Sequence, residues 1–443
     1  MGMQRRVVLI SALAVVAVGL GIGIPVAVTT GSNSPSSPAS KPAQPLAGAR
    51  IAARVGAAYE LVAARTSPPA ATGDPAALAT AEQKFSLALL KQLSDPAKNV
   101  TVSPASLGLA LAMLEHGAAG STLTQIQDAL QTAGMTPDDQ GAAWAALVKA
   151  WDDPASGVEL HAANSIWDQK GFRPSPSFLD ALQQYYSAGV WQADFRNDNA
   201  AATKALNDWV AQHTNGKIPQ LFDQLPRDTQ AVLANALYFK AMWQSPFDPH
   251  DTAPGQFSTD AGPVTTPFMQ AQATMSVSHT DKCTAVELPY TGGRFAALAI
   301  MPKSGSLTDF VSGMSTSDLS SIVSGLQRKE IDLRLPKFKT TATLDLNDVL
   351  GKLGMTTAFT DGADFSKMSA EGLKVGAVVQ RDYLSVAEKG TEAAAATGIV
   401  MEPTAARVPA PTVSFDHPFL FLIRDTTTGA ILFASQIQNP AAG

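Results

Sequence analysis

Cysteine is nearly missing from this chain: Cys283 is the only one among 443 residues. A single cysteine excludes an intramolecular disulfide and a structural zinc site built from cysteines. Cys283 begins an apolar run that predicts a strand ending at Pro289, so we expect a packed thiol rather than a nucleophile. A chain without disulfides must be stabilised by its core.

Charge is also scarce. Charged residues make up 16% of the sequence, the net charge is −6, and no basic run occurs. These values argue against binding to nucleic acid or another polyanion. Hydrophobic residues, at 45%, are typical of a globular protein with a substantial core.

The sequence lacks the short motifs of common hydrolases and nucleotide-binding enzymes. It has no Gly-x-Ser-x-Gly, no His-Glu-x-x-His and no Gly-rich phosphate loop. The six histidines are scattered, and we interpret His116, His213 and His417 as local structural residues. We therefore predict that the protein is not an enzyme and that it uses no metal and no cofactor.

The N-terminus carries a long apolar run. Arg5 and Arg6 precede apolar residues 7–28, which predicts a signal peptide or an N-terminal membrane anchor over residues 1–30. Both alternatives place the rest of the chain outside the cytoplasm, either secreted or tethered to the outer face of the cytoplasmic membrane. Residues 31–75 are predicted to be a Pro/Ser/Ala-rich linker with a short helical stretch within 49–64. Residues 76–443 show no further linker and predict one folded domain.

One segment of small residues follows a predicted buried strand. Residues 375–386 indicate the strand, and residues 388–398 read EKGTEAAAATG. Gly390 permits a turn out of the strand, and the residues after it carry little bulk, so the segment could fit between two strands of a sheet. Alternation along a strand would leave Glu392 on the outer face. An Ala-rich linker is the alternative interpretation.

Three other motifs stand at some distance from this segment. Ser103 is predicted to cap a helix that begins at Pro104 and contains Ser106. Residues 235–240 read NALYFK and belong to a predicted strand, with Trp243 shortly after it. Residues 415–435 form two alternating apolar runs around a Thr-Thr-Gly turn, which predicts a buried hairpin.

In order and spacing these motifs, from about residue 99 to 440, resemble the serpin family. The resemblance implies an α+β fold with a large central mixed β-sheet, additional smaller sheets, about nine helices and an exposed reactive-centre loop. It implies a serine protease inhibitor that acts as a suicide substrate: a protease cleaves the loop, an acyl-enzyme is trapped, and the loop inserts into the central sheet. By the same resemblance the hinge of the loop consists of Glu388, Gly390, Thr391, Glu392, Ala393, Ala394, Ala395, Ala396 and Thr397. The region where the sheet opens is expected to contain Ser103, Ser106, Asn235, Gln380 and Trp243.

Two departures from the family pattern affect these expectations. Gln380 stands where many serpins place a histidine; it can still bridge Ser103 and Asn235, but it cannot make that contact pH-dependent as a histidine could. Residues 138–151, which are expected to be helical, contain only one basic residue, Lys149. Serpins activated by heparin have a basic helix about here, so we expect no glycosaminoglycan partner.

The reactive bond depends on the direction of counting. Counting forward from the hinge gives Thr404-Ala405, which suits elastase-like or subtilisin-like serine proteases. Counting backward from Phe415 gives Arg407-Val408, which suits a trypsin-like protease. We prefer the forward count, because insertion uses the residues before the cut. A non-inhibitory serpin that serves as a binding or storage protein is the alternative function, and a monomer is expected in either case.

Overall fold

The computed structural model describes residues 59–62, 73–153, 157–214, 216, 218–391 and 409–442. The apolar N-terminal run, the hinge residues Glu392, Ala393, Ala394, Ala395, Ala396 and Thr397, and both candidate reactive bonds, Thr404-Ala405 and Arg407-Val408, lie outside the described residues. Predictions about them therefore remain predictions. Among the described helices, none is long and apolar enough to cross a membrane.

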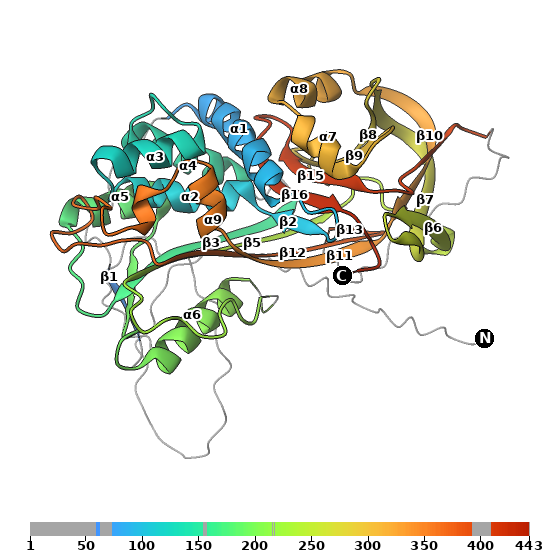
Figure 1. Cartoon of the computed structure of the whole chain (residues 1–443). Helices are drawn as coiled ribbons and strands as arrows, with labels where there is room; N and C mark the ends of the chain where they lie inside the picture. Colours follow the sequence, from blue (N-terminus) through green and yellow to red (C-terminus); the bar gives the residue numbers. More distant parts are fainter. Residues whose placement is uncertain are drawn as a thin grey trace, which may run out of the picture. The chain divides into compact units, whose positions relative to one another are not determined.

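Sheet A, with seven strands, runs the length of the domain (Figure 1). In spatial order its strands are β1 (Tyr59–Val62), β4 (Val190–Ala193), β3 (Val158–Gln169), β5 (Ala231–Met242), β13 (Gly390–Thr391), β12 (Ala377–Ala387) and β11 (Phe338–Asp345). The sheet is mixed, because β3 pairs with β4 and β5 pairs with β12 in parallel, whereas the other pairs are antiparallel. This is the large mixed sheet expected from the sequence.

Sheet B has nine strands. They are β14 (Thr412–Ser414), β10 (Gln327–Pro336), β7 (Gly262–His279), β8 (Cys283–Pro289), β9 (Phe295–Pro302), β15 (Phe419–Asp425), β16 (Ile431–Ile437) and β2 (Val100–Val102), with β6 (Ala253–Thr259) beside β7. The strands that were expected in separate smaller sheets are joined here because β7 is 18 residues long and pairs with β6, β10 and β8 along successive parts of its length. The predicted hairpin is β15–β16, and all residues of its two strands are buried.

Nine α-helices and two short 3-10 turns occur in the described part of the chain. They are α1 (Pro75–Leu93), α2 (Pro104–Glu115), α3 (Gly120–Leu130), α4 (Pro137–Trp151), α5 (Pro176–Tyr186), α6 (Asn199–His213), α7 (Leu307–Gly313), α8 (Thr316–Ser324), α9 (Asn347–Lys352), η2 (Pro249–Asp251) and η3 (Thr357–Phe359). Four of the α-helices begin at a proline whose preceding Asp, Ser or Thr side chain accepts a backbone hydrogen bond. Proline suits the first helical position because the N–H it lacks would have no partner there.

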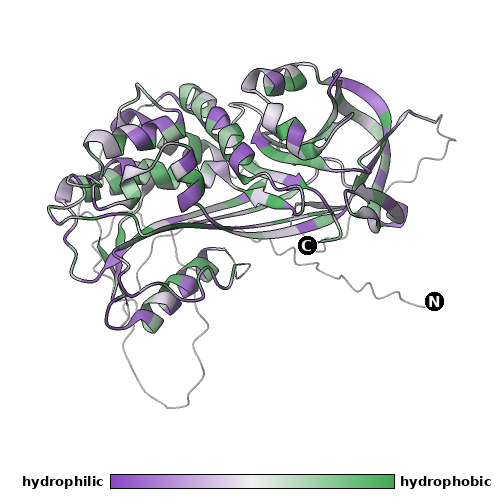
Figure 2. Ribbon diagram, viewed as in Figure 1, coloured by the Kyte–Doolittle hydropathy of each residue, from purple (hydrophilic) through white to green (hydrophobic). Residues whose placement is uncertain are grey.

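The helices cover the two faces of sheet A unequally. Among the described helices, α1 to α5 and α9 lie on one face, and α6 lies on the other (Figure 1). Every residue of α2 is buried, which agrees with its apolar character all round and places it between the sheets. Figure 2 shows the hydrophobic residues on the inner strands and helix faces and the hydrophilic ones mostly outside.

Strand β1 corrects one expectation from the sequence. Helical character was predicted within residues 49–64, but Tyr59–Val62 is a strand that pairs with β4 at the edge of sheet A. The ring of Tyr59 lies 5.5 Å from that of Trp167 and 5.6 Å from that of Trp191. Tertiary pairing has overridden the local preference of an Ala-rich sequence, and the folded body therefore includes residues before position 76.

Candidate functional site at the opening of sheet A

Two neighbouring strands near the centre of sheet A, β5 and β12, pair with each other at one end only. Strands β5 and β12 pair in parallel from Ala377–Val232 to Gln380–Asn235. Beyond that point, within the described strands, residues 381–385 of β12 pair with β11, and residues 236–240 of β5 pair with β3. The ladder between β5 and β12 is thus interrupted.

The first two loop residues occupy the far end of this interruption. Strand β13 lies between β5 and β12, with Gly390 opposite Ala387 and Met242, and Thr391 opposite Val386 and Ala241. The backbone of the hinge therefore already belongs to sheet A for two residues. We call the space between residues 381–385 and 236–240 the sheet gap.

A buried polar cluster lies at the closed end of the sheet gap. The Gln380 Nε2 atom donates to the Ser103 carbonyl oxygen at 2.8 Å and to Asn235 Oδ1 at 2.7 Å. The Asn235 Nδ2 atom donates to the Ser106 carbonyl oxygen at 2.6 Å. Asn164 on β3 also belongs to the cluster, because its Oδ1 accepts from Asn235 Nδ2 and from Ser106 Oγ.

The sequence predicted the centre of this cluster. The resemblance grouped Ser103, Ser106, Asn235 and Gln380 in one region and allowed Gln380 to bridge Ser103 and Asn235, and the structure brings these residues into contact. Their role in opening the sheet stays a prediction. The sequence missed Asn164, because the residue that faces Asn235 across β3 depends on strand register. Gln380 is fully buried, yet its Oε1 atom has no hydrogen-bond partner in the described part of the protein.

Trp243 marks the other end of the sheet gap, as expected. Its Nε1 atom donates to the Ala387 carbonyl oxygen at 2.9 Å, and its ring stacks on Tyr290 with centroids 4.5 Å apart. The Tyr290 hydroxyl lies 2.6 Å from Thr391 Oγ1. Burial raises the pKa of Tyr290, so its hydroxyl stays protonated, and either oxygen can donate in this contact. The sequence did not indicate Tyr290, which is 101 residues from its partner.

Glu388 holds the base of the hinge through its side chain. Its Oε1 atom accepts from Lys337 Nζ and from Thr252 Oγ1, both at 2.9 Å. Burial alone would raise the pKa of Glu388, but the hydrogen bonds from Lys337 and Thr252 outweigh it, so the pKa lies below its usual value. The Glu388 carboxylate is therefore charged and connects the hinge to the strand region that follows β10.

Gly390 is required by the local geometry. Its φ of +148° is unfavourable for residues with a side chain, and a Cβ atom there would overlap the Ala241 carbonyl oxygen and lie 2.8 Å from Met242 Cα. The backbone of β5 thus approaches the hinge too closely for any other residue. The sequence predicted glycine for a turn, and the structure adds this steric reason.

Asp382 is a buried acid that the sequence analysis passed over. It lies on β12 two residues after Gln380, on the same buried face. Burial raises the pKa of Asp382 well above its usual value, and the Ser103 backbone N–H offsets this only in part. The alternation of the predicted strand could have located it, because an acidic residue at an inward position is unusual.

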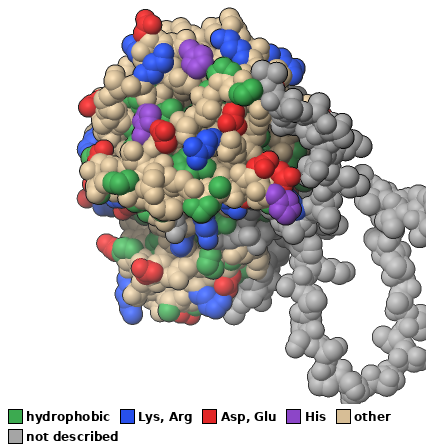
Figure 3. Space-filling model, turned by 90° about the vertical axis from the view of Figure 1, so that its right-hand side faces the viewer, with side chains coloured by type: hydrophobic (Ala, Val, Ile, Leu, Met, Phe, Trp, Pro, Cys, Tyr) green, Lys and Arg blue, Asp and Glu red, His purple; other side chains and the backbone are tan. Residues whose placement is uncertain are grey.

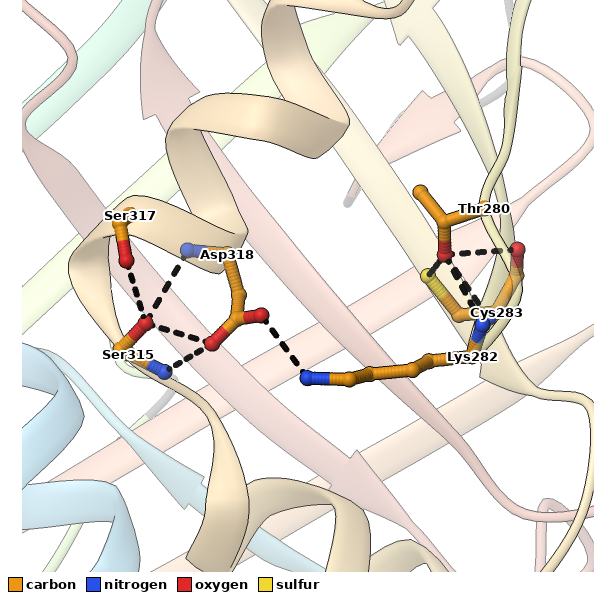
Figure 4. Close-up of polar contacts among 6 residues, drawn as sticks. All are labelled: Thr280, Lys282, Cys283, Ser315, Ser317 and Asp318. Atoms are coloured by element: carbon orange, nitrogen blue, oxygen red, sulfur yellow. Dashed lines mark hydrogen bonds and ion pairs between the residues drawn. The ribbon is translucent and has the colours of Figure 1, made fainter.

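The remaining residues singled out from the sequence make contacts that are typical of structural residues. Cys283 is buried, its Sγ lies 3.3 Å from Thr280 Oγ1, and burial raises the pKa of the thiol (Figure 4). The neighbouring Lys282 pairs instead with Asp318 at 3.1 Å. His116 lies against Tyr186, His213 against the Trp209 carbonyl, and His417 against the Pro302 carbonyl. Across the described ranges, no group of three or more His, Cys, Asp or Glu could hold a metal ion.

Helix α4 and the face of the protein in Figure 3 carry charges of both signs. Helix α4 has one basic residue in its last turn, Lys149, and two acidic residues in its first turn. On the face shown in Figure 3, Lys and Arg side chains of the described residues are interspersed with Asp and Glu and form no patch of one sign. The expectation of no nucleic-acid or glycosaminoglycan partner stays a prediction.

Comparison of the sequence with known families gives one match over most of the chain. The model described as serpin (serine protease inhibitor) matches residues 80–440. A serpin-like protein of Thermococcus kodakarensis is 34% identical over 378 residues, which cover 84% of this chain and 88% of the relative. A serine protease inhibitor of Rattus norvegicus is 35% identical over 377 residues, which cover 83% and 90% of the two chains.

Solved structures agree with this match. The native state of tengpin, a thermophilic serpin, superposes with a TM-score of 0.78 at 28% identity and covers 85% of this chain and 97% of tengpin. Thyroxine-binding globulin in complex with thyroxine gives a TM-score of 0.75 at 30% identity, with coverage of 82% and 99%. The chain therefore belongs to the serpin family, with the α+β fold that its sequence motifs predicted.

Proposed function

We propose that this protein inhibits a serine protease as a suicide substrate. The observation that carries the proposal is the sheet gap, with Gly390 and Thr391 already paired between β5 and β12. The residues that follow, Glu392 to Thr397, are small or can face outward on alternate positions. A strand made of these residues would fit the sheet gap, because residues 381–385 of β12 and residues 236–240 of β5 do not pair with each other.

The chemistry belongs to the protease. Its serine Oγ attacks the carbonyl carbon of Thr404, the Thr404-Ala405 peptide bond breaks, and the serine proton passes through the protease's general base to the new amine of Ala405. The product is an ester between the serine and Thr404, which water would normally hydrolyse. Insertion of the freed hinge before hydrolysis traps the ester. This protein therefore supplies no catalytic residue, metal or cofactor.

Insertion moves the attached protease along the sheet. Adding residues 392–402 to β13, at about 3.3 Å per residue, displaces the ester by roughly 35 Å. The new strand gains ladder hydrogen bonds on both sides, each worth about 1 kcal/mol net. The intact fold is thus held short of its most stable arrangement, and cleavage releases it.

The reactive bond selects the target. Thr404-Ala405 lies at the distance from the hinge that insertion requires, and its small residues suit elastase-like or subtilisin-like proteases. Arg407-Val408 remains the alternative and would attract a trypsin-like protease through a carboxylate in its specificity pocket. We propose further that the inhibitor acts as a monomer outside the cytoplasm, delivered by the apolar residues 7–28.

A binding or storage serpin is the second candidate. Thyroxine-binding globulin, a structural neighbour, was solved with thyroxine bound, so the fold does not by itself require inhibition. The sheet gap and the small hinge residues favour the inhibitor, because a protein that only binds a ligand has no need to accept a strand.

A mixing experiment tests the proposal. The protein is incubated with elastase, subtilisin and trypsin, and the products are run on denaturing gels while the released C-terminal peptide is sequenced. We expect a complex that resists SDS and a peptide that begins at Ala405; a peptide that begins at Val408 assigns the alternative bond. Thr404→Pro should abolish the complex at the first bond, and Arg407→Ala serves as its matched control. Cleavage without any complex would refute inhibition.

A further inference from the structure

A small cavity lies inside the layer of helices that covers one face of sheet A. Helices α1, α2 and α4 contact one another there (Figure 1). The cavity has a volume of about 10 Å³, which is enough for one water molecule and for nothing larger. Its lining includes the buried residues Glu82, Phe85, Gly108, Thr132, Gln140 and Trp144.

Gln140 brings an acceptor without a partner to this cavity. Its side chain is fully buried, and its Nε2 atom donates to Thr132 Oγ1 at 2.9 Å. Its Oε1 atom has no hydrogen-bond partner in the described part of the chain. A buried amide oxygen in this state loses the hydrogen bonds that it makes to water in the unfolded chain. Gln140 Oε1 therefore requires a donor.

Glu115, which also lies beside Gln140, does not supply that donor. Burial raises the pKa of Glu115, and the hydrogen bond from Gln140 lowers it in part. A neighbour lowers the pKa of a carboxyl when it donates to the charged form, so Glu115 faces the Nε2 branch of the Gln140 amide. The Oε1 atom is the other branch of the same amide and is left for the cavity.

Glu82 faces the cavity from α1. Its Oε2 atom accepts from the Ile431 backbone N–H at 2.8 Å, and its Oε1 atom lies 2.6 Å from Ser86 Oγ. Burial raises the pKa of Glu82 to about 8, although both hydrogen bonds lower it in part, so the carboxyl is neutral at pH 7. A neutral carboxyl has a hydrogen that it can donate. The cavity thus lies between a donor on α1 and an acceptor on α4.

We propose that this cavity is a binding site for one water molecule, held between Glu82 on α1 and Gln140 on α4. The water accepts from the Glu82 carboxyl, donates to Gln140 Oε1, and directs its second hydrogen to Thr132 Oγ1. Three hydrogen bonds are the usual number for a buried water. Because Glu82 also binds the Ile431 N–H, the water extends a hydrogen-bonded connection from the terminal hairpin through α1 to α4. The site does not depend on whether the protein inhibits a protease.

A high-resolution crystal structure of the full-length protein tests the site directly. We expect one ordered water within hydrogen-bond distance of both a Glu82 carboxyl oxygen and Gln140 Oε1. A cavity without an ordered water would overturn the proposal. A Gln140 amide turned the other way, with Oε1 accepting from the Thr132 hydroxyl, would overturn it too, because Oε1 would then have a partner in the protein.

Filling the cavity tests the energetic role of the water in solution. A methyl group added at Gly108 would lie 3.1 Å from Trp144 Cζ2 and 3.9 Å from Phe85 Cε1, so Gly108→Ala places it in the cavity lining. In wild type this methyl should displace the water and leave Gln140 Oε1 without a partner. A Gln140→Met background keeps the volume but removes the acceptor, so the same displacement should cost nothing there.

Unfolding of the full-length variants in guanidinium gives the readout. We expect Gly108→Ala to change the unfolding equilibrium constant about tenfold more unfavourably in wild type than in Gln140→Met. The better helix propensity of alanine contributes equally in both backgrounds and cancels. Gly351→Ala in α9 is the matched control, because nothing lies within 4 Å of its added methyl, and it should have the same effect in both backgrounds. Equal effects of Gly108→Ala in the two backgrounds would show that no water is held by Gln140.

Discussion

Substituting Gly390 by alanine tests whether the hinge lies inside sheet A in the intact protein. The added methyl group meets the Ala241 carbonyl oxygen. Ala241 is paired with Val158 of β3, so its backbone cannot move aside as a flexible side chain could. We therefore expect the hinge to leave the sheet. Its departure loses the pairings with Ala241 and Met242 and the contact between Thr391 and Tyr290.

The magnitude follows from these losses. Three contacts at about 1 kcal/mol each give roughly 3 kcal/mol. The conformational cost of a positive φ, about 1 to 2 kcal/mol for a residue with a Cβ, is not added, because it is relieved once the hinge has left the sheet. Gly262→Ala is the matched control: its φ of +116° is also unfavourable, but nothing lies within 4 Å of the added methyl. The control should therefore lose only the conformational part, about 1 to 2 kcal/mol.

Thermal unfolding of the intact proteins gives the readout. We expect the midpoint of Gly390→Ala to fall by roughly 5 °C more than that of Gly262→Ala, given 2 to 4 °C for each kcal/mol in domains of moderate size. The Gly390 variant should also form less SDS-resistant complex, because insertion must start again from outside the sheet. Equal losses in the two variants would refute the placement of β13 between β5 and β12.

Three further predictions follow from other contacts. Ala393→Arg should raise the number of molecules of this protein consumed per protease severalfold, because insertion would bury the charge. Ala394→Arg, on the outer face, should leave this stoichiometry near that of wild type. Equal stoichiometries in the two variants would contradict the prediction that residue 393 faces the core after insertion. Burial raises the pKa of Glu115 to about 8, so this residue lowers the free energy of unfolding progressively as pH rises from about 4.5 to 8. Glu115→Gln should therefore raise the free energy of unfolding by on the order of 3 kcal/mol at pH 7. Unfolding curves of this variant should also show a weaker dependence of stability on pH. Lys337→Met should lose about 2 kcal/mol at pH 7. Because the pKa of Glu388 is lowered, the difference from wild type should disappear only as the pH falls below the usual range of a glutamate carboxyl and Glu388 is protonated. A difference that persists in acid would rule out the ion pair as its cause.

The sequence predicted the parts of this protein that depend on local pattern. Capped helix starts, the apolar strands and the terminal hairpin all follow from residue type and spacing, and Gln380 was placed correctly because the family order of motifs fixed its neighbours. The parts it missed depend on pairing between distant segments. Nothing near Tyr290 in the chain indicates Thr391, and nothing near Asn164 indicates Asn235. Register had to be known before those contacts could be inferred.

The extra strand at the outer edge of sheet A changes what can safely be trimmed from this protein. Tyr59–Val62 precedes the residues that match the family, so a shortened version beginning at Ala76 looks complete by sequence. Such a truncation would remove the strand that pairs with the outer edge of β4 and the ring contact between Tyr59 and Trp191. An uncovered edge of this kind invites strand addition from another molecule, and preparations that start at that residue should therefore aggregate more readily than the longer chain.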